Sequence, residues 1–234
     1  MKTGRYIVFF LAILSFDCLS QSDGYVALSV GGGLPTSHFG ANDIGDSTGG
    51  FARPGLNLGL NIAVKTSKKL GFCATVRNQS NALDADAFVK QYDKKYPNIK
   101  WTMNADNWNV KMFAAGVYSS FPVGDSSFSI NLKAMIGYAS CTLPGFTITG
   151  TQNGNTVTAT QGSQTSGSLC FVIGIGFKKN LGESFCFIGG LDYMRTNPSF
   201  TDVPVNFSNG TKQKVNVSQS ITLVIISVGV GYRL

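Results

Sequence analysis

A regular alternation of apolar with small or polar residues runs through much of this chain and constrains its fold more than any other feature. It is clearest in residues 54–65, where Leu, Ile and Val alternate with Gly, Asn and Ala. Because successive side chains of a strand point to opposite faces, a period of two predicts a β-strand with one apolar face. The same pattern predicts seven further strands: residues 25–34, 70–78, 108–121, 128–139, 169–177, 185–195 and 227–234.

The connections between these strands alternate in length. Short and long connections that alternate along a chain are typical of an up-and-down barrel with tight turns at one end and long loops at the other. In the strand of residues 108–121 the phase slips near residues 114–116, which predicts a β-bulge. The short connections are residues 66–69, 122–126 and 178–184, and the long ones are residues 36–53, 80–107, 142–166 and 197–217.

Two of the long connections have a recognisable composition. The second contains acidic residues followed by Lys90, Lys94 and Lys95, an order that suits a helix dipole, and Pro97 then ends the predicted helix. Phe88 and Tyr92 lie four residues apart, so they can pack together on the rim of the barrel. The third, residues 142–166, is rich in Thr, Gln, Gly and Ser and is expected to be a polar, mobile loop.

The chemistry of the two faces indicates which one is inside. Charged residues make up only 13% of the chain, about half the share typical of soluble domains. The polar face consists mainly of Gly, Ala, Ser, Asn and Cys, which suits the narrow lumen of an eight-stranded barrel. The opposite face is large and branched. We therefore predict an all-β fold, an eight-stranded antiparallel up-and-down transmembrane β-barrel. Its aromatic girdle is expected at Trp108, Tyr138, Tyr193 and Tyr232.

The inward phase of the predicted strands carries several polar and charged residues. Because isolated buried charge is costly, these side chains must pair with each other or hold water. They include only one acid, so either Asp106 or another loop acid folds in, or ordered water and anions compensate. The lumen then forms a structural plug or a narrow anion path. The predicted lumen network is Asn57, Asn61, Arg77, Lys111, Asn131, Lys133, Asp192 and Arg233.

The N-terminal residues predict an export signal. Lys2 and Arg5 precede an apolar core at residues 6–16, which is shorter than the roughly 20 residues of a spanning helix. We expect a signal peptide over residues 1–20, cleaved between Ser20 and Gln21, and one barrel domain over residues 21–234. A lipoprotein signal ending at Cys18 and a buried core helix are the alternatives.

Four cysteines remain after that cleavage: Cys73, Cys141, Cys170 and Cys186. An even number in an exported chain allows disulfides. None of the four has the CxxC spacing of a zinc or thioredoxin-like motif. The cysteines are therefore interpreted as small apolar fillers inside strands, with disulfide pairing left open.

Candidate catalytic residues are few. The single histidine, His38, lies in the first long connection after Thr36 and Ser37. Hydroxyl residues beside a histidine weakly resemble a hydrolytic site. No His cluster, carboxylate ladder or phosphate loop is present in the sequence, so we predict no catalytic, metal or cofactor residues. The net charge of +7 is dispersed, without the Lys/Arg stripe of a nucleic-acid binder.

The C-terminal residues 228–234, Val-Gly-Val-Gly-Tyr-Arg-Leu, resemble the terminal strand of Gram-negative bacterial outer-membrane β-barrel proteins. Residues 54–61, Pro-Gly-Leu-Asn-Leu-Gly-Leu-Asn, are similar to an early strand of the same family. The resemblance implies an outer-membrane location, contact with its lipid, and Tyr232 and Leu234 as the signal read by the barrel-assembly machinery. The last residue is Leu where Phe is commoner in the family.

Together these observations predict a non-enzymatic outer-membrane barrel with a structural or surface-interaction role through its long extracellular loops. The loops would contact a surface ligand that the sequence does not identify. One alternative is a narrow transport barrel for small solutes or anions. Another is a lipid-modifying enzyme that uses His38.

Overall fold

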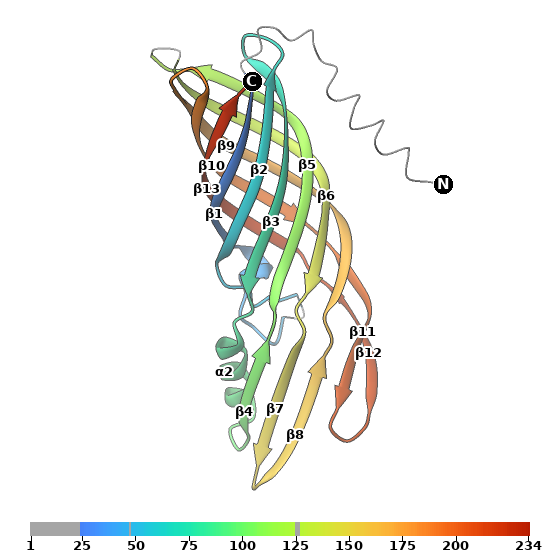
Figure 1. Ribbon diagram of the computed structural model, residues 1–234. Coiled ribbons are helices and arrows are strands. Elements are labelled where there is room, and N and C mark those ends of the chain that lie inside the picture. Colours follow the sequence, from blue (N-terminus) through green and yellow to red (C-terminus); the bar gives the residue numbers. More distant parts are fainter. Residues whose placement is uncertain (1–23, 47, 125–126) are drawn as a thin grey trace, which may run out of the picture.

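The chain folds into a closed antiparallel barrel, as predicted (Figure 1). The computed structural model describes residues 24–46, 48–124 and 127–234, so the predicted signal peptide and its cleavage site lie outside the described residues. Around the barrel the order is β1-β13-β10-β9-β6-β5-β3-β2. The barrel strands are β1 (Tyr25–Pro35), β2 (Gly55–Lys65), β3 (Leu70–Ala82), β5 (Asn107–Pro122), β6 (Phe128–Leu143), β9 (Gln164–Leu181), β10 (Phe185–Thr196) and β13 (Ile221–Arg233).

The first and last strands close the barrel. Tyr25 of β1 pairs with Arg233 of β13, and Pro35 pairs with Leu223 at the other end of the same ladder. Closure gives every strand two neighbours, so none of the eight is a sheet edge. Both the start of β1 and the C-terminus lie at the end of the barrel that carries the tight turns, which we call the short-turn end. The opposite end is the long-loop end.

Three of the four long connections form a second sheet, the extension, which lies beyond the long-loop end (Figure 1). Its five strands are ordered β12-β11-β8-β7-β4. The expectation that residues 142–166 form a mobile loop is wrong, because most of that segment is the hairpin of β7 and β8. Its threonines pair across the strands, as in the 3.1 Å contact of the Thr147 and Thr160 hydroxyls. The five strands are β4 (Lys100–Ala105), β7 (Phe146–Gln152), β8 (Asn155–Gln161), β11 (Ser199–Phe207) and β12 (Lys212–Ser218).

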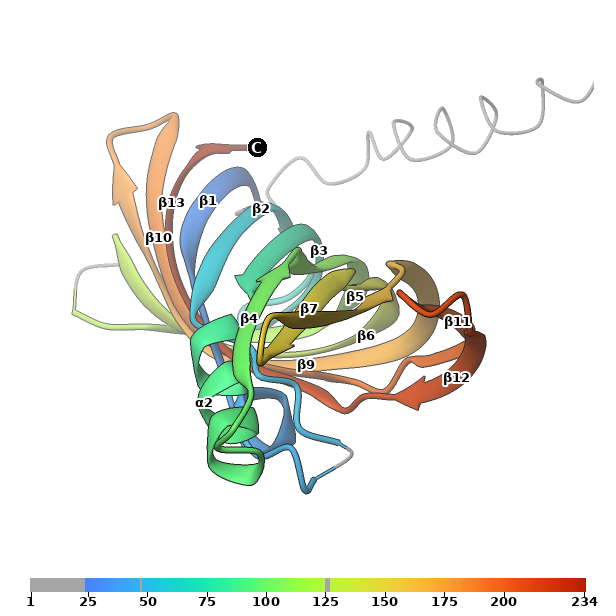
Figure 2. The same cartoon turned by 90° about the horizontal axis from the view of Figure 1, so that it is seen from below.

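The predicted helix is present as α2 (Ala85–Lys95). Asp84 caps it by accepting a hydrogen bond from the Ala87 N–H, and this satisfies one of the free donors of the first turn. Its Phe88 and Tyr92 rings stack at 5.1 Å, and Tyr92 meets Trp101 of β4 edge-to-face. The helix therefore packs on the extension, at the mouth of the barrel, which is the opening of the lumen at the long-loop end (Figure 2).

The predicted bulge in β5 is wrong. From Asn107 to Pro122 the strand keeps one register with β3 and one with β6. The apparent slip in the sequence arises because the large inward residues change to small ones along an unbroken strand. The register does shift in the extension, between Phe200 and Val203 of β11, where Asp202 adopts a positive φ of 58°.

The helices in the described part of the chain are short. These are α2 and the 3-10 turn η1 (Ser37–Gly40). Neither one has the length and apolar character needed to cross a membrane.

Candidate functional site: the lumen and the capped mouth

Three of the predicted lumen charges meet at the centre of the barrel. Arg77 of β3 donates from Nη2 to the carboxylate of Asp192 on β10, across the lumen. Lys133 of β6 places its Nζ 2.9 Å from Oδ1 of the same carboxylate. Asp192 is completely buried, and a methyl group at Gly174 would occupy the place of its carboxylate. These three residues, the central charge cluster, connect three separate strands through one acid.

A polar chain continues from this cluster toward β1. Arg77 donates from Nε to the Thr75 hydroxyl at 3.2 Å, and that hydroxyl donates to the Asn61 side chain at 3.0 Å. Asn61 in turn donates to the Ser29 hydroxyl at 2.9 Å. Asn61 was expected in the lumen. Thr75 and Ser29 were missed because small hydroxyl residues on the inward phase look like ordinary fillers.

The other predicted lumen residues are more scattered. Asn57 is completely buried inside the barrel, and Asn131 lies on the inward phase of β6. Arg233 lies at the short-turn end, where its Nη1 donates to the Gly182 carbonyl at 3.1 Å. Asp106 is exposed at the long-loop end and does not join the central charge cluster.

Two predictions for β5 are wrong. Lys111 is exposed on the outside of the barrel, whereas Trp108 is buried inside it and donates from Nε1 to the Gly50 carbonyl at 2.9 Å. The neighbours of Lys111 across the ladders are Asn78 and Ser140, both polar and on the same face. This part of β5 therefore has a polar outside and an apolar inside, as in a water-soluble barrel. The apolar-outside pattern begins only at Phe113.

Apolar side chains fill much of the long-loop half of the lumen. Phe39 of η1 is fully buried and meets Trp108 edge-to-face at 5.5 Å, and Phe200 of β11 meets Trp108 from the extension. Below them, inward residues of β5, β6, β9, β10 and β13 complete one cluster. Its members include Val110, Met112, Ala139, Cys141, Val172, Met194, Ile221, Leu223 and Ile225. The lumen is thus closed twice, by charge pairing at the centre and by apolar packing at the mouth.

The outside of the barrel carries an apolar belt. In β2 the belt runs from Leu56 to Val64, a length that matches the 9–11 residues of a spanning strand. Tyr138 and Tyr232 are exposed on this face, and Tyr193 lies half-buried among its neighbours, 6.0 Å from Phe171. Large exposed residues of the belt include Leu28, Leu58, Phe72, Val117, Ile136, Leu169, Ile173 and Val230. A closed barrel with such a belt is suited to lipid, because no backbone edge is left unpaired there.

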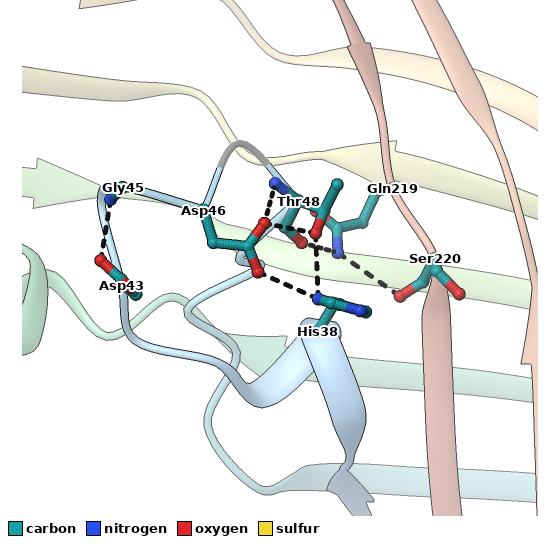
Figure 3. A network of polar contacts seen from close by, with 7 residues as sticks. All are labelled: His38, Asp43, Gly45, Asp46, Thr48, Gln219 and Ser220. Atoms are coloured by element: carbon teal, nitrogen blue, oxygen red, sulfur yellow. Dashed lines mark hydrogen bonds and ion pairs between the residues drawn. The ribbon is translucent and has the colours of Figure 1, made fainter.

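The described residues between β1 and β2, which we call the cap, cover the mouth of the barrel. A polar network holds the cap in place (Figure 3). Asp46 accepts a hydrogen bond of 2.6 Å from the Thr48 hydroxyl, and its other oxygen lies 2.9 Å from Nδ1 of His38. Gln219 then donates to the Thr48 carbonyl at 2.9 Å. The hydrogen bonds from the Thr48 hydroxyl, then those from His38 and the Thr48 N–H, lower the pKa of Asp46 to about 2. Asp46 is therefore ionised at neutral pH.

This network does not have the geometry of a catalytic triad. The Thr48 hydroxyl lies 3.0 Å from Nδ1 of His38, the same nitrogen that contacts Asp46. In a triad the nucleophile contacts the other ring nitrogen, Nε2. Within residues 24–46, 48–124 and 127–234, no hydroxyl is hydrogen-bonded to Nε2 of His38. His38 and Asp46 therefore fix the cap.

A cavity of about 230 Å³ lies beside this network, under the cap and against α2 and the extension; we call it the mouth cavity. Among the described residues, Asp46 is the one charged residue in its lining. Gln161 and Gln219 also line it, and each donates from its amide nitrogen to a backbone carbonyl. Five aromatic residues complete much of the wall: Phe51, Phe88, Tyr92, Trp108 and Phe146.

The cysteines and metal-ligating residues form no further site in the described part of the chain. No disulfide joins Cys73, Cys141, Cys170 or Cys186 within the described residues, and all except Cys73 are buried. No group of three His, Cys, Asp or Glu side chains there is placed to hold a metal ion.

Comparison with known proteins finds similarity in structure alone. No family model and no curated protein matches the chain. The outer membrane protein OprG from Pseudomonas aeruginosa is 16% identical, with a TM-score of 0.48 over 91% of this chain and 96% of that one. Neisserial surface protein A is 13% identical, with a TM-score of 0.46 over 92% and 100%. Ail, the attachment invasion locus protein of Yersinia pestis, is 11% identical, with a TM-score of 0.41 over 91% and 99%.

The closed eight-stranded barrel and its apolar belt decide the class of this protein. The chain is a β-barrel of the outer-membrane type. The sequence predicts the residues of the central charge cluster but does not predict the packing of side chains at the mouth. No short motif marks the mouth, because Phe39, Trp108 and Phe200 come from three distant segments that meet only in the folded chain.

Proposed function

We propose that this barrel is a non-enzymatic surface protein of the outer membrane, and that it acts through the sheet and helix at its long-loop end. The observation that carries the proposal is the five-stranded extension itself. A barrel that served only as a membrane plug would need no ordered sheet beyond the lipid. The polar outside of β5 near Lys111 supports the same orientation, with the long-loop end in water.

The interior argues against transport. A solute would have to separate Asp192 from Arg77 and Lys133, and then displace the buried Phe39 and Trp108. Leaving buried charges unpaired is costly. His38 contributes to the cap through Nδ1, and this argues against an enzyme built on that residue.

A matched pair of variants tests the surface role. In the first, residues 146–161 are replaced by an Asn-Gly turn, which removes the β7–β8 hairpin and leaves β6 and β9. In the second, Lys68 and Lys69 at the short-turn end are replaced by Ser. Cells that display each protein are applied to arrays of glycans and extracellular proteins. We expect binding to be lost in the first variant and kept in the second.

The fold of each variant is checked by its heat-modifiable shift on gels and by membrane fractionation. Equal binding of a folded hairpin variant and the unmodified protein would contradict the proposal. Loss of binding in the short-turn variant would contradict it as well.

A further inference from the structure

We propose that the mouth cavity is a binding site for a small organic amine, an ammonium group attached to an apolar or aromatic body. The cavity combines one carboxylate with five aromatic rings. Its volume of about 230 Å³ is below the ~300–1,000 Å³ of drug-sized sites, so it suits a fragment-sized molecule.

The charges of the lining favour a cation. Asp46 is the one charged side chain that the described residues contribute to the lining, and both carboxylate oxygens are already held in place by Thr48 and His38. An oxygen has a second lone pair, so each of them can accept a further hydrogen bond from an ammonium group. Preorganisation of this kind removes part of the entropic cost of binding.

The polar groups of the wall also favour a ligand that donates hydrogen bonds. Trp108 donates its N–H to Gly50, and the amide nitrogens of Gln161 and Gln219 donate to the carbonyls of Pro144 and Thr48. The single N–H of Trp108 is therefore engaged, and so are both N–H groups of Gln219, which also donates to the Ser220 carbonyl, whereas Gln161 keeps one further N–H. Each of the two amides also has a carbonyl oxygen, which accepts hydrogen bonds.

The aromatic rings supply the rest of the recognition. The ring centroid of Phe88 lies 5.0 Å from that of Phe51, 5.1 Å from that of Tyr92 and 5.9 Å from that of Phe146. These rings therefore form one continuous wall. Ring faces attract cations, and the attraction grows when the cation is desolvated. The wall also packs against an apolar body, which a free inorganic cation lacks.

The test compares phenethylamine with 2-phenylethanol, which has a similar shape and carries a hydroxyl in place of the ammonium. Binding to the refolded full barrel in detergent micelles is followed by calorimetry and by tryptophan fluorescence. We expect the amine to bind about tenfold more tightly than the alcohol. Asp46→Asn is expected to remove this preference, and Phe88→Leu is expected to weaken amine binding severalfold.

Two controls separate the carboxylate from the fold of the cap. Asp43→Asn makes the same charge change in the same segment but outside the cavity lining, and it should keep the preference. His38→Ala loosens the network without removing the Asp46 carboxylate, and it should also keep the preference. Equal affinity for amine and alcohol, no measurable amine binding, or loss of the preference in either control variant would overturn the proposal. The surface role is tested separately by the hairpin variant, so either idea can fail alone.

Discussion

The centre and the mouth of this barrel close the same lumen by opposite means. At the centre, a single carboxylate from Asp192 holds Arg77 and Lys133 inside a wall of small residues. At the mouth, Phe39, Trp108 and Phe200 pack with aliphatic residues in one apolar cluster. The charge cluster depends on one acid, whereas the apolar cluster spreads its stability over many contacts. Single substitutions are therefore expected to have much larger effects at the centre than at the mouth.

The largest effect is expected from Asp192→Asn. The substitution leaves Arg77 and Lys133 buried without a compensating charge, and breaking a buried pair in this way costs about 3–5 kcal/mol. The free energy of unfolding is measured by urea titration of the barrel in lipid vesicles. The matched control is Asp202→Asn. Oδ1 of Asp202 lies 3.7 Å from Nζ of Lys214, and an exposed ion pair of this kind contributes about 1 kcal/mol or less to stability. Equal losses in the two variants would remove the distinction between centre and surface.

A second pair of variants compares two lysines that the sequence places on the same phase. Lys133→Met takes one partner from Asp192, and we expect a loss of about 1–3 kcal/mol because Arg77 remains. Lys111→Met changes an exposed residue and should alter stability by no more than about 0.5 kcal/mol. The same urea titration measures both. A large loss for Lys111→Met would place that side chain inside the barrel and contradict the structure.

At the mouth, Phe39→Leu keeps an apolar side chain but removes the edge-to-face contact with Trp108. We expect a loss of about 1 kcal/mol, confined to the cap. Hydrogen exchange at the Gly50 and Ala52 amides, which bond to carbonyls of η1, should become faster while barrel amides keep their protection. Phe72→Leu on the exposed belt is the control and should change neither. A global loss of protection in Phe39→Leu would show that mouth and centre unfold as one unit.

The smallest effect concerns the pH response of the cap. The lowered pKa of Asp46 means that its contacts stabilise the cap fully above its ordinary pKa of 3.8 and lose this contribution as the pH falls toward 2. Thr48→Val removes the largest cause, so the pKa of Asp46 should rise toward 3.8. His38→Ala should raise it less. Carboxyl chemical shifts across a pH titration report both values, and an unchanged pKa in Thr48→Val would contradict the network.

The barrel strands could be predicted because lipid and a narrow lumen together impose a period of two. In Gly55–Lys65 every outward residue is a large aliphatic one down to Val64, and the inward ones are mainly small. The extension gave a weaker signal. In β7 and β8 one face is a row of threonines and the other mixes Ile148, Gly150 and Val157, so the contrast between faces is small.

The two wrong predictions for β5, at Lys111 and Trp108, share one physical origin. Residues Asn107 to Met112 lie in a barrel strand but beyond the apolar belt, where water replaces lipid and the inside becomes the apolar side. A sequence pattern shows the alternation and leaves open the depth at which the outside changes from lipid to water. Lys111 and Trp108 were therefore assigned to the wrong faces. The mouth cavity could not be predicted at all, because its walls come from segments that are far apart in the chain.

The apolar face of this membrane barrel meets lipid and its small, polar face lines a closed lumen, and this placement of the two faces can be measured. Nitroxide labels placed singly along β2, in a variant whose cysteines are replaced by alanine, test it directly in lipid vesicles. We predict high collision rates with oxygen and low rates with a water-soluble nickel chelate at Leu58, Leu60 and Ile62. Labels at Asn57 and Asn61 should show low rates with both reagents. High nickel accessibility at Leu58, Leu60 and Ile62 would place that face in water and contradict its placement in lipid.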